Sequence, residues 1–172
     1  MQRKMLMFDP RLCTGCMHCM TSCATYHEGS TSLSKARLQI IRHEGHALTK
    51  IDEEDELIFV FVGCQQCEDP LCSLVCPVSA HTRDSETGAV IIDRTRCVGC
   101  RMCLMTCHFG AISFNQRERT VFKCDLCGGD PVCVKFCQSK ALKFVPVEQA
   151  PLSKRMYAAT KIMVNLLDKQ KD

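Results

Sequence analysis

The chain has 172 residues, of which 16 are cysteine, and its formal net charge at pH 7 is +3. A cysteine fraction this high is typical of a disulfide scaffold or a metal protein. Disulfides need an oxidising compartment, but the first ten residues do not resemble a signal peptide. The longest apolar candidate, residues 57–62, is too short to cross a bilayer. The sequence therefore predicts a cytoplasmic protein with no direct membrane insertion.

A first group of cysteines follows a short predicted strand at residues 5–8. Its spacing is C-x2-C-x2-C-x3-C, the cysteine run of bacterial-type ferredoxins, whose thiolates bind [4Fe–4S] clusters. Between the strand and the first cysteine stand an Asp and three further residues. The members are Cys13, Cys16, Cys19 and Cys23.

A long insertion, residues 24–63, separates the first group from the second. Apolar and β-branched residues predict strands at 38–42 and 57–62. Between them lies an acidic segment, residues 52–56. We expect this segment to be an exposed part of a hairpin connection, and the alternative is a docking patch for a basic partner.

Three further cysteine groups follow along the chain. The third repeats the spacing of the first, after a second predicted strand and Asp at residues 90–93. The second and fourth have a longer middle gap, with Asp-Pro pairs at 69–70 and 130–131 that predict turns. The groups are Cys64, Cys67, Cys72 and Cys76; Cys97, Cys100, Cys103 and Cys107; and Cys124, Cys127, Cys133 and Cys137.

Short elements are expected around these groups. Return strands are predicted at 110–114 and 140–145, and the cysteine runs themselves are predicted to be loops. The last cysteine of each group is expected to begin a short helix, over residues 24–27, 78–80, 109–111 and 139–141. The fold class is therefore α+β, with short strands and helices.

The segment from residue 151 differs from the rest of the chain. Apolar residues recur there at steps of four and three, which predicts an amphipathic helix over residues 151–172. The apolar positions are Leu152, Met156, Ala159, Met163 and Leu166. Such a helix covers its own domain or docks onto another subunit, and self-association through it is one hypothesis.

Sixteen thiols in four groups of four predict four [4Fe–4S] clusters and an electron carrier. A structural zinc-binding interaction module is the competing interpretation, but zinc favours two separated cysteine pairs for each ion. Each oxidised cluster with its thiolates carries about −2, so the loaded chain has a net charge of about −5. Nucleic-acid binding is not expected at this charge. Nucleotide-binding and hydrolytic motifs are not seen in the sequence, so the chain is expected to be non-catalytic, and its six histidines are expected to be structural or surface residues.

Spacing alone leaves the pairing of the four runs open, either consecutive or nested. The sequence resembles the four-cluster electron-transfer subunits of molybdenum and tungsten oxidoreductases, the dimethyl-sulfoxide-reductase beta-subunit type, which include partners of tungsten aldehyde oxidoreductases. The matching residues are the four runs and the phrases at 64–67, 72–77, 97–103 and 123–127. The resemblance covers about residues 5–145.

The resemblance implies nested pairing, in which the first three cysteines of one run share a cluster with the last cysteine of another. One ferredoxin-like unit with pseudo-twofold symmetry then comprises residues 1–60 and 111–150, and the other comprises 61–110, with 151–172 as a helical tail. The implied ligand sets are Cys13, Cys16, Cys19 and Cys137; Cys124, Cys127, Cys133 and Cys23; Cys64, Cys67, Cys72 and Cys107; and Cys97, Cys100, Cys103 and Cys76.

The resemblance implies two partners. One is a catalytic oxidoreductase subunit, expected to be a tungsten or molybdenum enzyme of the aldehyde type from anaerobic metabolism, and the other is a further redox protein. A hydrogenase, formate dehydrogenase or carbon monoxide dehydrogenase is the alternative partner.

Within the third run, Arg101 stands where the first run has His18. A fixed cation there favours the reduced cluster, and we expect Arg101 to raise its potential; a solvent-facing side chain is the alternative.

Overall fold

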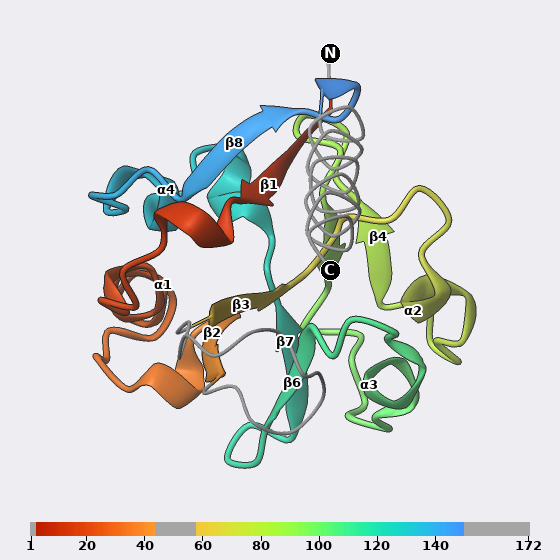
Figure 1. Ribbon diagram of the computed structural model, residues 1–172. Helices are drawn as coiled ribbons and strands as arrows, with labels where there is room; N and C mark the ends of the chain where they lie inside the picture. The colour runs from red at the N-terminus through yellow and green to blue at the C-terminus, as the bar shows by residue number, and fades with distance from the viewer. Residues whose placement is uncertain (1–2, 44–57, 150–172) are drawn as a thin grey trace, which may run out of the picture.

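The computed structural model describes residues 3–43 and 58–149. Within these residues, short strands pair into four antiparallel sheets of two strands each, and short helices lie between them (Figure 1). The fold is α+β, as predicted. The acidic segment at 52–56 and the predicted tail helix at 151–172 lie outside the described residues.

The strands agree well with the sequence-based expectation. The sheets are β1 (Lys4–Phe8) with β8 (Leu142–Pro146), β2 (Leu38–His43) with β3 (Ile58–Gly63), β4 (His81–Arg83) with β5 (Val90–Ile92), and β6 (Ile112–Asn115) with β7 (Thr120–Lys123). Strands β4 and β7 were not predicted, and the other six are confirmed to within a few residues. β2 and β3 pair antiparallel, as the predicted hairpin requires, while the segment that connects them lies outside the described residues.

The predicted helix positions are wrong for three of the four groups. The observed helices lie inside the cysteine runs, before the fourth cysteine, so these runs are not entirely loops. They are α1 (His18–Glu28), α2 (Leu71–Leu74), α3 (Met102–Thr106) and α4 (Val132–Lys135). Only α1 continues past its last cysteine and includes the predicted 24–27. Short 3-10 turns occur at Pro10–Leu12, Leu33–Lys35 and Leu126–Gly129.

A tight turn after the fourth cysteine explains the error. The carbonyl of Cys76 accepts the N–H of Ser79 at 3.2 Å, and the carbonyl of Cys107 accepts that of Gly110 at 3.1 Å. Ser79 and Gly110 have positive φ values of 48° and 58°. A left-handed residue cannot continue a right-handed helix, so the chain leaves this turn toward the return strand.

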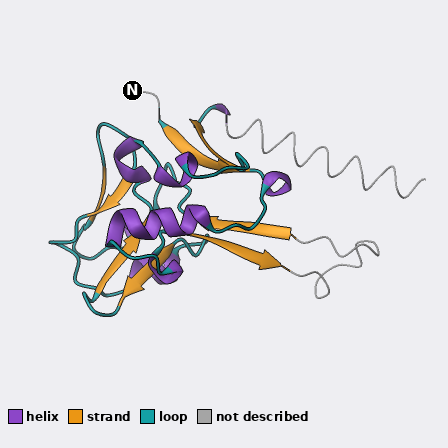
Figure 2. Cartoon of the chain, turned by 90° about the vertical axis from the view of Figure 1, so that its left-hand side faces the viewer, coloured by secondary structure: helices purple, strands orange, loops and turns teal. Residues whose placement is uncertain are grey.

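Two sides of the molecule have separate buried cores (Figure 1). The α1–α4 side contains the first and fourth cysteine groups with β1, β8, β2 and β3, and α1 packs against α4. The α2–α3 side contains the second and third groups with β4 to β7, and α2 packs against α3. Figure 2 views the molecule from the α1–α4 side, with α1 as its longest helix.

The larger core belongs to the α1–α4 side. It includes Ala24, Leu38 and Leu142, which are almost fully buried, and Phe8 stacks on Phe61 with ring centroids 5.7 Å apart. In the described part of the chain, the buried cluster of the α2–α3 side is smaller and comprises Cys103, Ile112 and Val121. Strands β6 and β7 therefore pack with the third cysteine group.

Candidate metal centres

The first three cysteines of the first run lie with the last cysteine of the fourth run. Cys13, Cys16, Cys19 and Cys137 line a hollow of about 330 Å³, including the part that is open to solvent. The rest of the lining is mainly apolar and includes Phe8, with Thr14 and Ser139 as polar members. Burial raises the pKa of the Cys19 thiol to about 12. The structure thus gathers residues from the beginning and the end of the described chain around one hollow.

Glycine at position 15 is required by the shape of the first run. Gly15 has a φ of +67°, and a Cβ atom there would lie 2.3 Å from the ring of Phe59. Met17 also has a positive φ, of 60°, and it stands directly before helix α1. These conformations turn the chain so that the successive thiols of the run face one hollow.

A second set of cysteine thiols lies where α1 packs against α4. Cys23 lies on α1 and Cys133 on α4, and both are buried. The Cys133 thiol interacts electrostatically with Cys124, Cys23 and Cys127, in addition to the burial that raises its pKa. Burial also raises the pKa of the Cys124 thiol to about 12. Thiols of this kind release protons when they bind iron.

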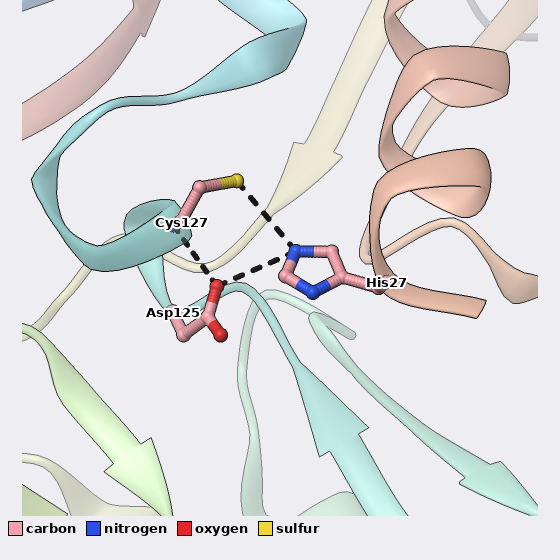
Figure 3. Close-up of side chains that lie close together, drawn as sticks. All are labelled: His27, Asp125 and Cys127. Atoms are coloured by element: carbon pink, nitrogen blue, oxygen red, sulfur yellow. Dashed lines mark hydrogen bonds and ion pairs between the residues drawn. The ribbon is translucent and has the colours of Figure 1, made fainter. Parts of the chain in front are cut away.

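Polar side chains lie beside Cys127 of this second group (Figure 3). His27 Nε2, from α1, lies 3.6 Å from Cys127 Sγ and 3.5 Å from Asp125 Oδ1. Asp125 also accepts the N–H of Cys127 at 3.0 Å and pairs with Arg37 at 2.6 Å. Because Cys127 belongs to the thiol group, His27 and Asp125 are its neighbours and do not form a separate metal site.

The α2–α3 side contains a second hollow. Cys64, Cys67, Cys72 and Cys107 line a space of about 320 Å³, including its open part. Burial raises the pKa of the Cys72 thiol, and the charge of Lys123 opposes this effect. Three cysteines of the second run thus lie with the last cysteine of the third run.

The remaining thiols lie around α3. Burial raises the pKa of the Cys103 thiol to about 11, and this thiol also interacts electrostatically with Cys72 of the second run and with Cys100 and Cys97. Cys76, their predicted fourth partner, follows α2, which packs against α3. Its Sγ accepts the backbone N–H of Ala80 at 3.3 Å.

Backbone N–H groups point at several of the sulfur atoms. Cys23 Sγ accepts from Arg37 at 3.3 Å, and Cys137 Sγ accepts from Leu142 at 3.4 Å. Such donors favour the thiolate over the thiol. Hollows lined by sulfur and apolar groups, with N–H donors aimed at sulfur, fit cubane clusters ligated by thiolates. When bound, such clusters take up and release single electrons.

The third run places Arg101 differently from the expectation. Arg101 is exposed, and its guanidinium lies 3.8 Å from the centroid of the Phe114 ring. It has a φ of 65° and stands directly before α3, as Met17 stands before α1. The counterpart of Arg101 in the first run is therefore Met17, and the alignment with His18 is wrong.

Two polar residues of the site were not predicted from the sequence. Gln66 and Lys123 are buried, with exposed fractions of 5% and 3%. Both residues belong to the sequence motifs at 64–67 and 123–127 on which the family resemblance rests. Their place in these motifs was the sequence signal that could have identified them as site residues. Hydropathy alone would place both residues at the surface.

Four groups of thiols in a fold of short strands and helices define an iron–sulfur electron-transfer protein. The residues 56–147 match the family model described as a 4Fe-4S dicluster domain. The chain belongs to this family. Its sixteen cysteines fit four [4Fe–4S] clusters. Within the described residues, no helix is long and apolar enough to span a membrane.

Several characterised proteins are similar to this chain in sequence, and their names describe subunits of oxidoreductases. The chain is 39% identical over 138 residues to the NADH-dependent phenylglyoxylate dehydrogenase subunit beta of Aromatoleum evansii; the match covers 80% of this chain but 29% of that subunit. It is 32% identical to the thiosulfate reductase electron transfer subunit PhsB of Salmonella typhi, covering 87% and 79% of the two proteins. It is 34% identical to the B subunit of the anaerobic dimethyl sulfoxide reductase of Escherichia coli (strain K12), covering 82% and 72%.

Proposed function

We propose that this chain is a non-catalytic subunit that relays electrons through four [4Fe–4S] clusters between a catalytic oxidoreductase subunit and a second redox protein. The observation that carries the proposal is the convergence of thiols from separate runs around common hollows. The clusters supply the one-electron chemistry, and the chain holds and separates them.

The proposed ligand sets are nested. The first hollow supports a set from the first run plus Cys137, and the second hollow supports a set from the second run plus Cys107. The electrostatic neighbours of Cys133 support a third set with Cys23. The fourth set joins Cys76 to the three thiols around α3.

The two units with pseudo-twofold symmetry belong to this proposal. Left-handed residues at equivalent places of the first and third runs, Gly15 with Gly99 and Met17 with Arg101, support a likeness between the two units. The packing of β6 and β7 against the third cysteine group favours a boundary after residue 123 rather than after 110.

Electrons are proposed to enter and leave where thiols reach the surface. Cys16 on the α1–α4 side and Cys100 on the α2–α3 side are exposed. Val98 and Met102, which flank Cys100 in the sequence, are exposed, and so are Leu74 of α2 and Met105 of α3, to 75% and 81%. Exposed apolar groups are typical of protein–protein contact surfaces. We assign this face to one redox partner and the Cys16 face to the other.

Two of the relatives support a proposal for the nature of the catalytic partner. The names thiosulfate reductase and dimethyl sulfoxide reductase support a molybdenum- or tungsten-dependent partner, in line with the resemblance. A reducing compartment such as the cytoplasm suits sixteen free thiols.

Elemental analysis tests the function directly. The holoprotein, purified anaerobically, should contain about 16 iron and equal sulfide for each chain, together with reducible signals in electron paramagnetic resonance. The proteins that co-purify with it should include a molybdenum or tungsten enzyme. Colourless protein that contains zinc would overturn the proposal in favour of the zinc module.

Paired substitutions test the nested ligand sets. Under nesting, Cys64 and Cys107 hold the same cluster, so the double variant Cys64→Ala/Cys107→Ala should lose no more iron than either single variant. The matched control Cys64→Ala/Cys76→Ala should lose about twice as much, because it damages two clusters. The opposite pattern would show that each run binds its own cluster.

A further inference from the structure

A buried lysine lies at the junction of the two sides of the molecule. Lys123 ends strand β7 directly before Cys124, and only 3% of its surface is exposed. Lysine is almost never buried to this extent without a compensating partner. Its surroundings therefore indicate which negative charge it compensates.

Three acceptors match the three N–H donors of the Lys123 ammonium group. Lys123 Nζ lies 3.5 Å from Cys64 Sγ and 3.2 Å from the carbonyl oxygen of Cys124, and it also donates to the carbonyl of Val90. The group is thus fixed by strand β5 and by the first cysteines of the second and fourth runs.

The side chain of Gln66 hydrogen-bonds to the backbone of the same two residues, Val90 and Cys124. Its Nε2 donates to the carbonyl of Cys124 at 3.1 Å, and its Oε1 accepts the N–H of Val90 at 2.8 Å. Val90 is therefore bonded through its N–H to Gln66 and through its carbonyl to Lys123. This network fixes the position of the ammonium group relative to both cysteine runs.

Carboxylates do not neutralise Lys123 anywhere in residues 3–43 and 58–149, where the ion pairs involve other side chains. Burial of an unpaired charge is strongly unfavourable. The available negative charge is that of the thiolates and the clusters they hold, each about −2 when oxidised. The charge of Lys123 acts on thiols of both sides, Cys72 and Cys124.

We propose that Lys123 is a positioning residue that serves as a shared counter-ion for two clusters, one ligated through Cys64 and Cys72 and the other through Cys124. This inference rests on the proposed function and its nested ligand sets. A fixed cation stabilises the reduced form, which carries one more negative charge. Lys123 therefore raises the reduction potentials of these two clusters together and favours the electron at the junction between the two sides.

Redox titration of the full holoprotein, followed by electron paramagnetic resonance, tests this role. Lys123→Gln should move the midpoints of two of the four clusters to lower potential and leave the other two unchanged. Lys123→Arg retains the charge and should restore both midpoints toward the wild-type values. The matched control is Lys135→Gln, which removes an exposed lysine of α4 that pairs with Asp130, and it should leave all four midpoints unchanged.

No shift in Lys123→Gln, an upward shift, or a shift of a single cluster would overturn the proposal. The wild-type protein separates this result from a failure of the proposed function. Four reducible clusters and about 16 iron in the wild type support the function whatever the variants show.

A measurement on the wild-type fold covers the case in which Lys123→Gln loses iron. In reduced protein labelled with ¹⁵N at the lysine side chains, pulsed electron paramagnetic resonance should detect coupling between a cluster and a lysine nitrogen. This coupling should persist in Lys135→Gln and disappear in Lys123→Arg, which carries no label at that position. Absence of the coupling in the wild type would contradict the proposed contact.

Discussion

The α1–α4 side and the α2–α3 side each combine one run of C-x2-C-x2-C-x3-C spacing with one run that has a longer middle gap, but they enclose their thiols differently. On the α1–α4 side, five cysteines are buried: Cys19, Cys23, Cys124, Cys133 and Cys137. On the α2–α3 side, only Cys103 is buried. The extra cover comes from the long helix α1 and the hairpin of β2 and β3, which the other side lacks. Ligand spacing therefore selects the cofactor, while the insertion between runs sets its contact with water.

Chelation should separate the two sides most strongly. Under anaerobic conditions with an iron chelator, the clusters of the α2–α3 side should be lost first, because their thiols are more accessible. Iron retained over time, together with the electron paramagnetic resonance signals that survive, measures the order. Simultaneous loss of all clusters would show that burial of the thiols does not control access.

Equivalent glycines in the first and third runs should respond unequally to Ala. A Cβ at Gly99 would lie 2.0 Å from the backbone oxygen of Arg119, whereas one at Gly15 would meet the side chain of Phe59. Gly99→Ala should destabilise its side by roughly 3 kcal/mol or more, since backbone must move. Gly15→Ala should cost about 1–2 kcal/mol for the left-handed conformation, plus the movement of a ring.

The temperature at which cluster absorbance is lost measures both effects. Gly110→Ala is the control, since Gly110 has a φ of +58° but nothing within 4 Å of the added Cβ. Its effect should be the smallest of the three. Equal effects at positions 15 and 99 would contradict the distinction between side-chain and backbone contacts.

Truncation of one buried side chain in each core should destabilise the protein according to the apolar volume that is removed. Leu142, in the larger core, and Val121, in the smaller one, are each 2% exposed. Leu142→Ala should cost about 3 kcal/mol and Val121→Ala about 2 kcal/mol. Each should lower the temperature of cluster loss mainly on its own side, as assigned by the signals that disappear first.

The smallest expected effect concerns Arg101. Arg101 directly follows Cys100 in the chain, but its guanidinium is exposed and lies over Phe114, so solvent weakens its action on a cluster. Arg101→Ala should lower the potential of one α2–α3 cluster slightly, and Met17→Arg should raise that of its counterpart. Arg101→Lys keeps the charge without the contact to Phe114 and serves as the control. A titration with no change in Arg101→Ala would favour a purely structural role.

The sequence was sufficient to predict the cysteine groups, six strands and the cofactor class, because ligand spacing and β-branched residues are local signals. The helices inside the runs were not predictable by periodicity, since α2 and α4 have four residues each and form between fixed thiols. Strand β4, with the sequence His-Thr-Arg, has no apolar alternation. Lys123 was missed because its burial arises from two runs that meet only in the folded structure.

The pairing of β1 with β8 has a consequence for synthesis. Met5 lies opposite Val145 and Leu6 opposite Phe144, so β1 cannot form its sheet until β8 has been synthesised. Strands β4 to β7 pair between neighbours and can assemble while the nascent chain is still growing. Maturation should therefore be vectorial, with iron loaded into the α2–α3 side before the α1–α4 side.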